Sequence, residues 1–100
     1  MPDLTIRELQ KVIRRKDYYP DRPLQYLQKL VEEVGELARA MRDGTRWADT
    51  GNIKGTIDEE FYDVLYYVTA LANIYGVDLQ TAMELKEPLN DIKYGRVSTD

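Results

Sequence analysis

The segment from residue 57 to residue 75 carries apolar side chains around most of its helical circumference. One set recurs at intervals of three and four, the period of an α-helix: Phe61, Val64, Leu65, Val68, Leu71, Ala72 and Tyr75. A second set fills most of the remaining wheel: Tyr62, Tyr66, Tyr67, Ala70 and Ile74. A helix that is apolar nearly all round is a buried helix. Because a chain of 100 residues builds only a modest core, we expect its own domain to cover one side and a second subunit to cover another.

Three further segments have helical periodicity, and none has the alternation of a convincing strand. Together with the first segment they give predicted helices over roughly residues 5–15, 23–42, 57–75 and 78–94. Neither an internal repeat nor a low-complexity segment divides the chain. The sequence therefore predicts an all-α fold, with residues 1–100 forming a single domain.

Local signals mark the ends of these helices. Thr5 and Glu8 have the spacing of a capping box, and Asp78 is a favourable N-cap. Pro88 lies inside the last helix and is expected to kink or interrupt it. Residues 44–56 are predicted to form a loop, and a loop of this length in a compact domain suggests function.

Charge and composition exclude several functions. The net charge is −4, whereas proteins that grip a nucleic-acid backbone usually carry a basic surface, so we expect no polymeric nucleic acid as partner. The chain has no Cys, which suits a cytoplasmic location, and no His, the commonest general base and transition-metal ligand. Neither a signal peptide nor a membrane span is expected, so no membrane partner is predicted.

Two acidic clusters stand on the two longest helices. Glu33 and Glu36 are three residues apart, as are Glu60 and Asp63, and this spacing places each pair on one helical stripe. Four carboxylates gathered at partly buried positions repel one another unless a cation joins them, and oxygen ligands favour Mg²⁺, Mn²⁺ or Ca²⁺. The alternative is a solvated acidic surface. A di-iron centre is disfavoured because its usual motif requires His.

The two clusters resemble the signature of the MazG-like all-α nucleoside triphosphate pyrophosphatase superfamily. That signature is EExxE, a loop and then ExxD. Here its acidic positions are Glu32, Glu33, Glu36, Glu60 and Asp63. A third motif of the family is matched further along the chain, at Lys86, Asn90, Lys93 and Tyr94. The resemblance extends from about Leu24 to Tyr94.

The resemblance implies an enzyme that uses Mg²⁺, or alternatively Mn²⁺, to cleave a nucleoside triphosphate between the α and β phosphates as house-cleaning of nucleotide pools. It implies that the metal is held by Glu33, Glu36, Glu60 and Asp63. It also assigns phosphate contacts to Lys86, Asn90, Lys93 and Tyr94. The implied fold is a four-helix bundle completed by homo-oligomerisation, as a homodimer or a dimer of dimers.

Some roles and rival functions stay open at this stage. Glu32 is a candidate catalytic residue that orients or deprotonates water, or else a solvent-facing side chain. Trp47 either stacks on the nucleobase or packs the loop onto the bundle. The rival enzyme is a phosphoribosyl-ATP pyrophosphohydrolase, although that branch often has His where this chain has Tyr66 and Tyr67. The rival from another class is a non-catalytic helical dimerisation or regulatory module.

Overall fold

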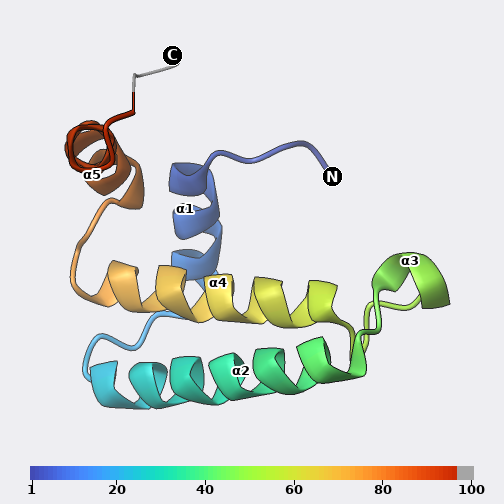
Figure 1. The fold of residues 1–100 in the computed structure, drawn as a ribbon. Coiled ribbons are helices and arrows are strands. Elements are labelled where there is room, and N and C mark those ends of the chain that lie inside the picture. The colour runs from blue at the N-terminus through green and yellow to red at the C-terminus, as the bar shows by residue number, and fades with distance from the viewer. Residues whose placement is uncertain (97–100) are drawn as a thin grey trace.

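The structure, a computed structural model, describes residues 1–96, and in that range it is helical without strands. The elements are α1 (Ile6–Lys16), α2 (Pro23–Asp43), α3 (Trp47–Thr50), α4 (Ile57–Ile74) and α5 (Leu79–Lys93) (Figure 1). The all-α prediction is confirmed, and α1, α2, α4 and α5 are the four predicted helices. The predicted loop differs in one respect, because residues 47–50 add a single helical turn.

Helices α2 and α4 run side by side in opposite directions, and α1 packs across α4 (Figure 1). We call the line of contact between α2 and α4 the seam. Ile13 of α1, Tyr26 of α2 and Ala70 of α4 form the buried cluster where the three helices meet. Helix α5 packs mainly against α1, so it lies apart from the seam. Across residues 1–96, no helix combines the length and apolar character that crossing a membrane requires.

The local signals explain where the helices begin and end. Thr5 and Glu8 form the predicted capping box at α1, and the Asp78 side chain accepts hydrogen bonds from the first turn of α5. Gly44 ends α2 at a φ of 72°, a left-handed conformation that favours glycine. Helix α5 continues through Pro88, so the expected interruption there is wrong. The backbone hydrogen bond lost at Pro88 does not end a helix whose N-terminus is capped and tied to α1.

Helix α4 has two covered faces and one open face. Asn73 is hydrogen-bonded to α1 through Gln10, and Ala70 lies in the buried cluster shared with α2. The third face is exposed along its length, and we call it the open face of α4: Phe61, Leu65, Val68 and Tyr75. Helix α2 has its own exposed apolar stripe: Leu24, Leu27, Val31, Val34 and Met41. The all-round apolar pattern of α4 is therefore only partly satisfied within one chain.

The accessible surface area and the radius of gyration are both large for a chain of this length. The accessible surface is 7578 Å² for a mass of 11.7 kDa, whereas a folded monomer of that mass exposes about 5,900 Å². The radius of gyration is 15.9 Å, compared with about 13 Å for a compact domain of this length. The single chain thus exposes more surface than a compact domain of its mass normally does, in agreement with the exposed apolar side chains of α2 and α4.

A buried amide network fastens the start of α5 to α1. The Gln10 side-chain nitrogen donates to the Asn73 side-chain oxygen at 3.1 Å and to the Val77 carbonyl at 2.9 Å. Its oxygen accepts from the Leu79 backbone at 2.8 Å. Gln10 and Asn73 are 7% and 6% exposed, so the hydrogen bonds between these two residues are shielded from water.

Replacing Gln10 with Ala is expected to lower the free energy of unfolding by about 2–3 kcal/mol, because several buried polar groups lose their partner at once. Urea denaturation followed by circular dichroism measures this. Gln28→Ala, at an exposed position of α2, is the matched control and should change stability by no more than about 0.5 kcal/mol. Equal effects of the two substitutions would contradict the importance of the network.

Candidate metal centre

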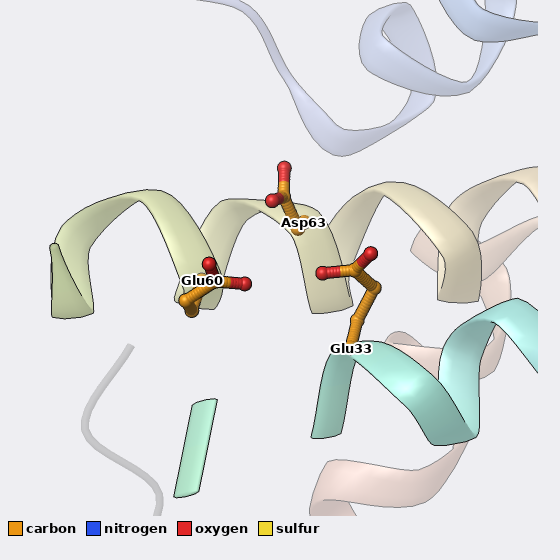
Figure 2. Close-up of side chains that lie close together, drawn as sticks. All are labelled: Glu33, Glu60 and Asp63. Carbon is orange, nitrogen blue, oxygen red and sulfur yellow. The ribbon is translucent and has the colours of Figure 1, made fainter. Parts of the chain in front are cut away.

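Three carboxylates meet across the middle of the seam, and we call them the acidic triad: Glu33, Glu60 and Asp63. One oxygen from each lies within 4.8 Å of the others. In Figure 2 the Glu33 carboxylate, which comes from α2, points toward that of Glu60 on α4, and Asp63 stands one turn further along α4. The spacing of three on α4 and the antiparallel packing of α2 bring together residues that are about 30 positions apart in sequence.

The triad is electrostatically strained without a cation. Burial raises the pKa of Glu60 to about 7, and hydrogen bonding to Glu33 and the charges of Asp63, Glu33 and Glu59 act in the same direction. The pKa of Asp63 is raised first by burial and then by the charge of Glu33. The Glu60 Oε2 atom is buried and has no hydrogen-bond partner in the part of the chain described. A buried acceptor without a donor, facing two further carboxylates, indicates a place for a cation.

The donor set fits a hard divalent ion. All three side chains offer only carboxylate oxygens, which suit Mg²⁺, Mn²⁺ or Ca²⁺ better than the softer ions that prefer nitrogen or sulfur. Each member of the triad is only partly buried, so a bound ion can keep water or substrate oxygens as further ligands. The centre can therefore hold a metal ion that remains accessible to an anionic substrate.

Glu36 stands next to this group. Its carboxylate is ion-paired with Arg39, one turn along α2. Glu36 and Glu60 nevertheless line one cavity of about 250 Å³, together with Arg39, Ala40, Asp43 and Gly55. The structure thus brings three of the four predicted metal ligands within reach of one ion, and it places the fourth across a shared cavity from Glu60.

The other acidic residues of the two motifs have different surroundings. Glu32 is exposed and is ion-paired with Lys29 at 3.3 Å. Glu59 accepts a hydrogen bond from the Gly55 backbone at 2.9 Å and lies 3.8 Å from the Lys54 amine. Glu59 therefore anchors the loop that precedes α4, while Glu32 faces solvent beside the triad.

The loop between α2 and α4 is fixed to the start of α4. Both nitrogens of the Arg46 fork donate to Asp58 at 3.0 Å, and the Trp47 backbone donates to Asp58 at 2.8 Å. The hydrogen bond from Arg46, followed by that from Trp47, lowers the pKa of Asp58 to about 2. Trp47 is 53% exposed on this anchored loop. Its hydrogen-bond partner Asp58 is two residues before Glu60 on α4.

The predicted phosphate-binding residues are not brought to the triad within one chain. Lys86, Asn90 and Lys93 lie on α5, which packs mainly against α1. Tyr94 follows as the C-cap, with the Lys93 amine 5.3 Å from the centre of its ring. Figure 1 shows α5 on the far side of α1 from the loop and α3.

Sequence reasoning missed two cations close to the acidic residues. Lys29 is four residues before Glu33, and Arg39 is three residues after Glu36. Both spacings place the cation on the same helical stripe as the carboxylate. The signal was present in the sequence, and the structure gives each cation an acidic partner, Glu32 for Lys29 and Glu36 for Arg39.

The raised pKa of Glu60 predicts that metal binding weakens in acid. Below a pH of about 7 this carboxyl group is protonated in the metal-free protein, so a metal ion must displace a proton. We expect the affinity for Mg²⁺ or Mn²⁺ to fall about tenfold for each pH unit below that value. Calorimetric titration with Mn²⁺ between about pH 5.5 and 7.5 measures it, and an affinity that stays constant over this range would contradict the assignment.

The same shift gives the sign of the pH dependence of stability. A raised carboxyl pKa means that the folded protein binds more protons than the unfolded chain between the ordinary value of 4.5 and about 7. The stability of the metal-free protein should therefore rise as the pH is lowered from 7 toward 4.5. The expected trend is opposite to the one for metal affinity, so the two measurements check each other.

Comparison with known proteins agrees with this arrangement. The chain is similar to iMazG from Vibrio DAT 722 in two crystal structures, with TM-scores of 0.82 and 0.81 and sequence identities of 49% and 48%. These matches cover 93% and 88% of this chain and 100% and 99% of the matched chains. The protein YpjD of Bacillus subtilis (strain 168) is 33% identical over 89 residues, which are 82% of this chain and 79% of that protein.

The sequence model of the MazG nucleotide pyrophosphohydrolase domain matches residues 21–87. This range includes α2, α4 and the whole acidic triad. The resemblance inferred from the acidic motifs is confirmed, and with it an enzyme that hydrolyses phosphoanhydride bonds of nucleotides. The chain belongs to the MazG nucleotide pyrophosphohydrolase family.

Proposed function

We propose that this protein is a Mg²⁺-dependent pyrophosphohydrolase that cleaves a nucleoside triphosphate between the α and β phosphates. The products are then a nucleoside monophosphate and pyrophosphate. The observation that carries the proposal is the acidic triad, with three carboxylate oxygens within 4.8 Å and, among the residues that the structure describes, one buried oxygen without a hydrogen-bond partner. An anionic substrate is repelled by such a site unless a cation is bound there.

The metal ligands proposed are Glu33, Glu60 and Asp63, joined by Glu36 from across the shared cavity. When bound, Mg²⁺ neutralises phosphate charge and increases the acidity of a coordinated water molecule. Release of Glu36 from Arg39 frees both a ligand and a guanidinium. The freed Arg39 then lies in the same cavity as Glu60, where its planar fork suits phosphate oxygens.

We propose Glu32 as the residue that orients or deprotonates the attacking water. Its carboxylate is exposed next to Glu33, and its present partner is an exposed lysine that also stands one turn from Glu33. The chain has no His or Cys, so the proton acceptor is a carboxylate or a metal-bound hydroxide. The expected result of Glu32→Gln is a lower kcat with unchanged affinity for Mn²⁺, which separates this role from that of the metal ligands.

Homo-oligomerisation belongs to the same proposal. The open face of α4 and the apolar stripe of α2 are exposed on a chain whose total surface is about 1,700 Å² larger than that of a typical monomer of this mass. An excess of this size on one chain is about twice the ~800 Å² that each partner contributes to an interface of standard size, so it suits an extensive interface. We propose that a second copy covers these faces, as a homodimer or a dimer of dimers, and that α5 supplies Lys86, Asn90, Lys93 and Tyr94 to phosphates in that assembly.

Purified protein incubated with a panel of standard and modified nucleoside triphosphates tests the substrate class. The panel includes phosphoribosyl-ATP, and each substrate is run with Mg²⁺, with Mn²⁺ and with a chelator. Turnover of triphosphates with the metals and none with the chelator supports the proposal. Exclusive turnover of phosphoribosyl-ATP favours the rival enzyme, and metal binding without turnover of any substrate favours a regulatory module. A house-cleaning role and a cytoplasmic location stay predictions.

A further inference from the structure

A second cavity opens one helical turn from the acidic triad. It has a volume of about 200 Å³ and lies at the turn between α1 and α2. We call it the tyrosine pocket, after the residues that dominate its lining: Tyr19, Tyr26, Tyr67, Arg22, Gln25 and Lys29. It is separate from the cavity that Glu36 shares with Glu60.

The pocket and the triad lie along the same two helices. Lys29 precedes Glu33 by four residues on α2, and Tyr67 follows Asp63 by four residues on α4. Four residues advance a helix by about 6 Å, or one turn, on one stripe. Because α2 and α4 are antiparallel, both steps lead in the same direction along the seam. One ligand of nucleotide size can therefore touch the triad and the pocket together.

The turn that forms the pocket is held in place by the half-buried carboxylate of Asp17, which also lines the pocket. Asp17 accepts hydrogen bonds from the hydroxyl of Tyr66 at 2.6 Å and from the hydroxyl of Tyr26. These bonds tie the end of α1 to both α2 and α4. The side of the pocket formed by Tyr26 is thus fixed before any ligand arrives, which reduces the entropic cost of binding.

The pocket lining suits a nucleoside. Tyr19 is 52% exposed and offers an accessible aromatic face, with the Arg22 guanidinium 5.3 Å from the ring centre. Tyrosine rings and guanidinium planes stack on any of the nucleobases. The exposed Gln25 amide carries both donors and an acceptor, which match the edge of a base. Lys29 stands between the pocket and Glu33, where an ammonium group meets the phosphate nearest the sugar.

We propose that the tyrosine pocket binds the base and sugar of the substrate whose phosphates lie at the acidic triad. The inference rests on the proposed function and adds to it a nucleoside subsite on the side of the triad away from Trp47. The Trp47 backbone is hydrogen-bonded to Asp58 at the start of α4. Glu60 and Asp63 follow Asp58 on that helix and precede Tyr67, so the triad lies between Trp47 and Tyr67. The base therefore turns toward α1, and Trp47 makes the smaller contribution to binding.

The test compares binding of a non-hydrolysable nucleoside triphosphate analogue with binding of inorganic tripolyphosphate, both with Mg²⁺, by calorimetry. Tyr19→Ala and Gln25→Ala are each expected to weaken the analogue roughly tenfold, as the loss of one stacking or edge contact does. Tripolyphosphate lacks base and sugar, so its affinity should not change. Tyr18→Ala and Gln28→Ala are the matched controls, because neither residue lines the pocket.

Each outcome decides the inference. Selective loss of the analogue in Tyr19→Ala and Gln25→Ala supports it. Unchanged analogue binding in both variants, or selective loss in Trp47→Ala, overturns it and places the base elsewhere. Equal loss of both ligands also overturns it, because the pocket then serves the phosphates or the fold. If the wild-type protein binds neither ligand with Mg²⁺ and hydrolyses no triphosphate, the proposed function itself has failed.

Discussion

Glu60→Gln is expected to abolish metal-dependent turnover while making the metal-free protein at least as stable as the wild type. Partners of metal ligands outside the coordination sphere already contribute 10–100-fold to affinity or activity, so loss of a ligand should reduce activity by at least about 100-fold. The same change alters a partly buried carboxylate whose pKa is raised by burial and whose buried Oε2 has no hydrogen-bond partner among residues 1–96. It therefore relieves repulsion inside the triad.

Mn²⁺ calorimetry and a turnover assay measure the loss of metal binding and activity. Thermal unfolding in a chelator measures the stability of the metal-free protein. Glu87→Gln is the control, because it makes the same chemical change at an exposed position of α5 outside the triad. It should leave affinity, turnover and melting temperature unchanged. A Glu60→Gln protein that loses activity because it is unfolded, or that keeps activity with Mg²⁺, would contradict the assignment of the metal site.

Leu65→Asp is expected to prevent the proposed oligomer from forming and to leave a monomer. Leu65 lies on the open face of α4, where it is 39% exposed in the single chain. A second copy covering that face would bury the introduced carboxylate without a partner, which costs several kcal/mol per ion. Each of two symmetric copies contributes one Asp, so the free energy of association is reduced twice and the interface is not expected to form.

Sedimentation equilibrium measures this change directly. The wild type should have at least twice the 11.7 kDa mass of one chain, and the Leu65→Asp variant should have the single mass. Asn52→Asp places the same charge at an exposed position of the loop between α3 and α4, away from both apolar faces, and should leave the proposed oligomer intact. A wild-type protein that is monomeric at high concentration would contradict the proposed oligomer.

The sequence predicted the helices because their signals are local. Apolar spacing, the Thr5 capping box and the Gly44 stop act within a few residues, and the structure places the helix ends within about one residue of the prediction. The expected interruption at Pro88 was wrong, because one missing backbone donor does not by itself end a helix. The anchoring of α5 through Gln10 comes from a contact 69 residues away in the chain, which no local pattern reveals.

The acidic site was predictable in part, because the spacing of acidic residues within one helix is a local signal. Spacing alone puts Glu60 and Asp63 on one stripe, but it does not say which oxygens meet across the seam. The structure adds that Glu33 joins them and that Glu36 instead pairs with Arg39. The tyrosine pocket had no sequence signal, because its residues come from the α1–α2 turn, α2 and α4 and meet only through tertiary packing.

The central claim is that a metal ion at the acidic triad directs cleavage between the α and β phosphates. Phosphorus NMR of a nucleoside triphosphate incubated with the protein tests it most directly. The account predicts nucleoside monophosphate and pyrophosphate with Mg²⁺, and neither product with a chelator or with Glu60→Gln. Nucleoside diphosphate and phosphate, or pyrophosphate that still appears with Glu60→Gln, would contradict it.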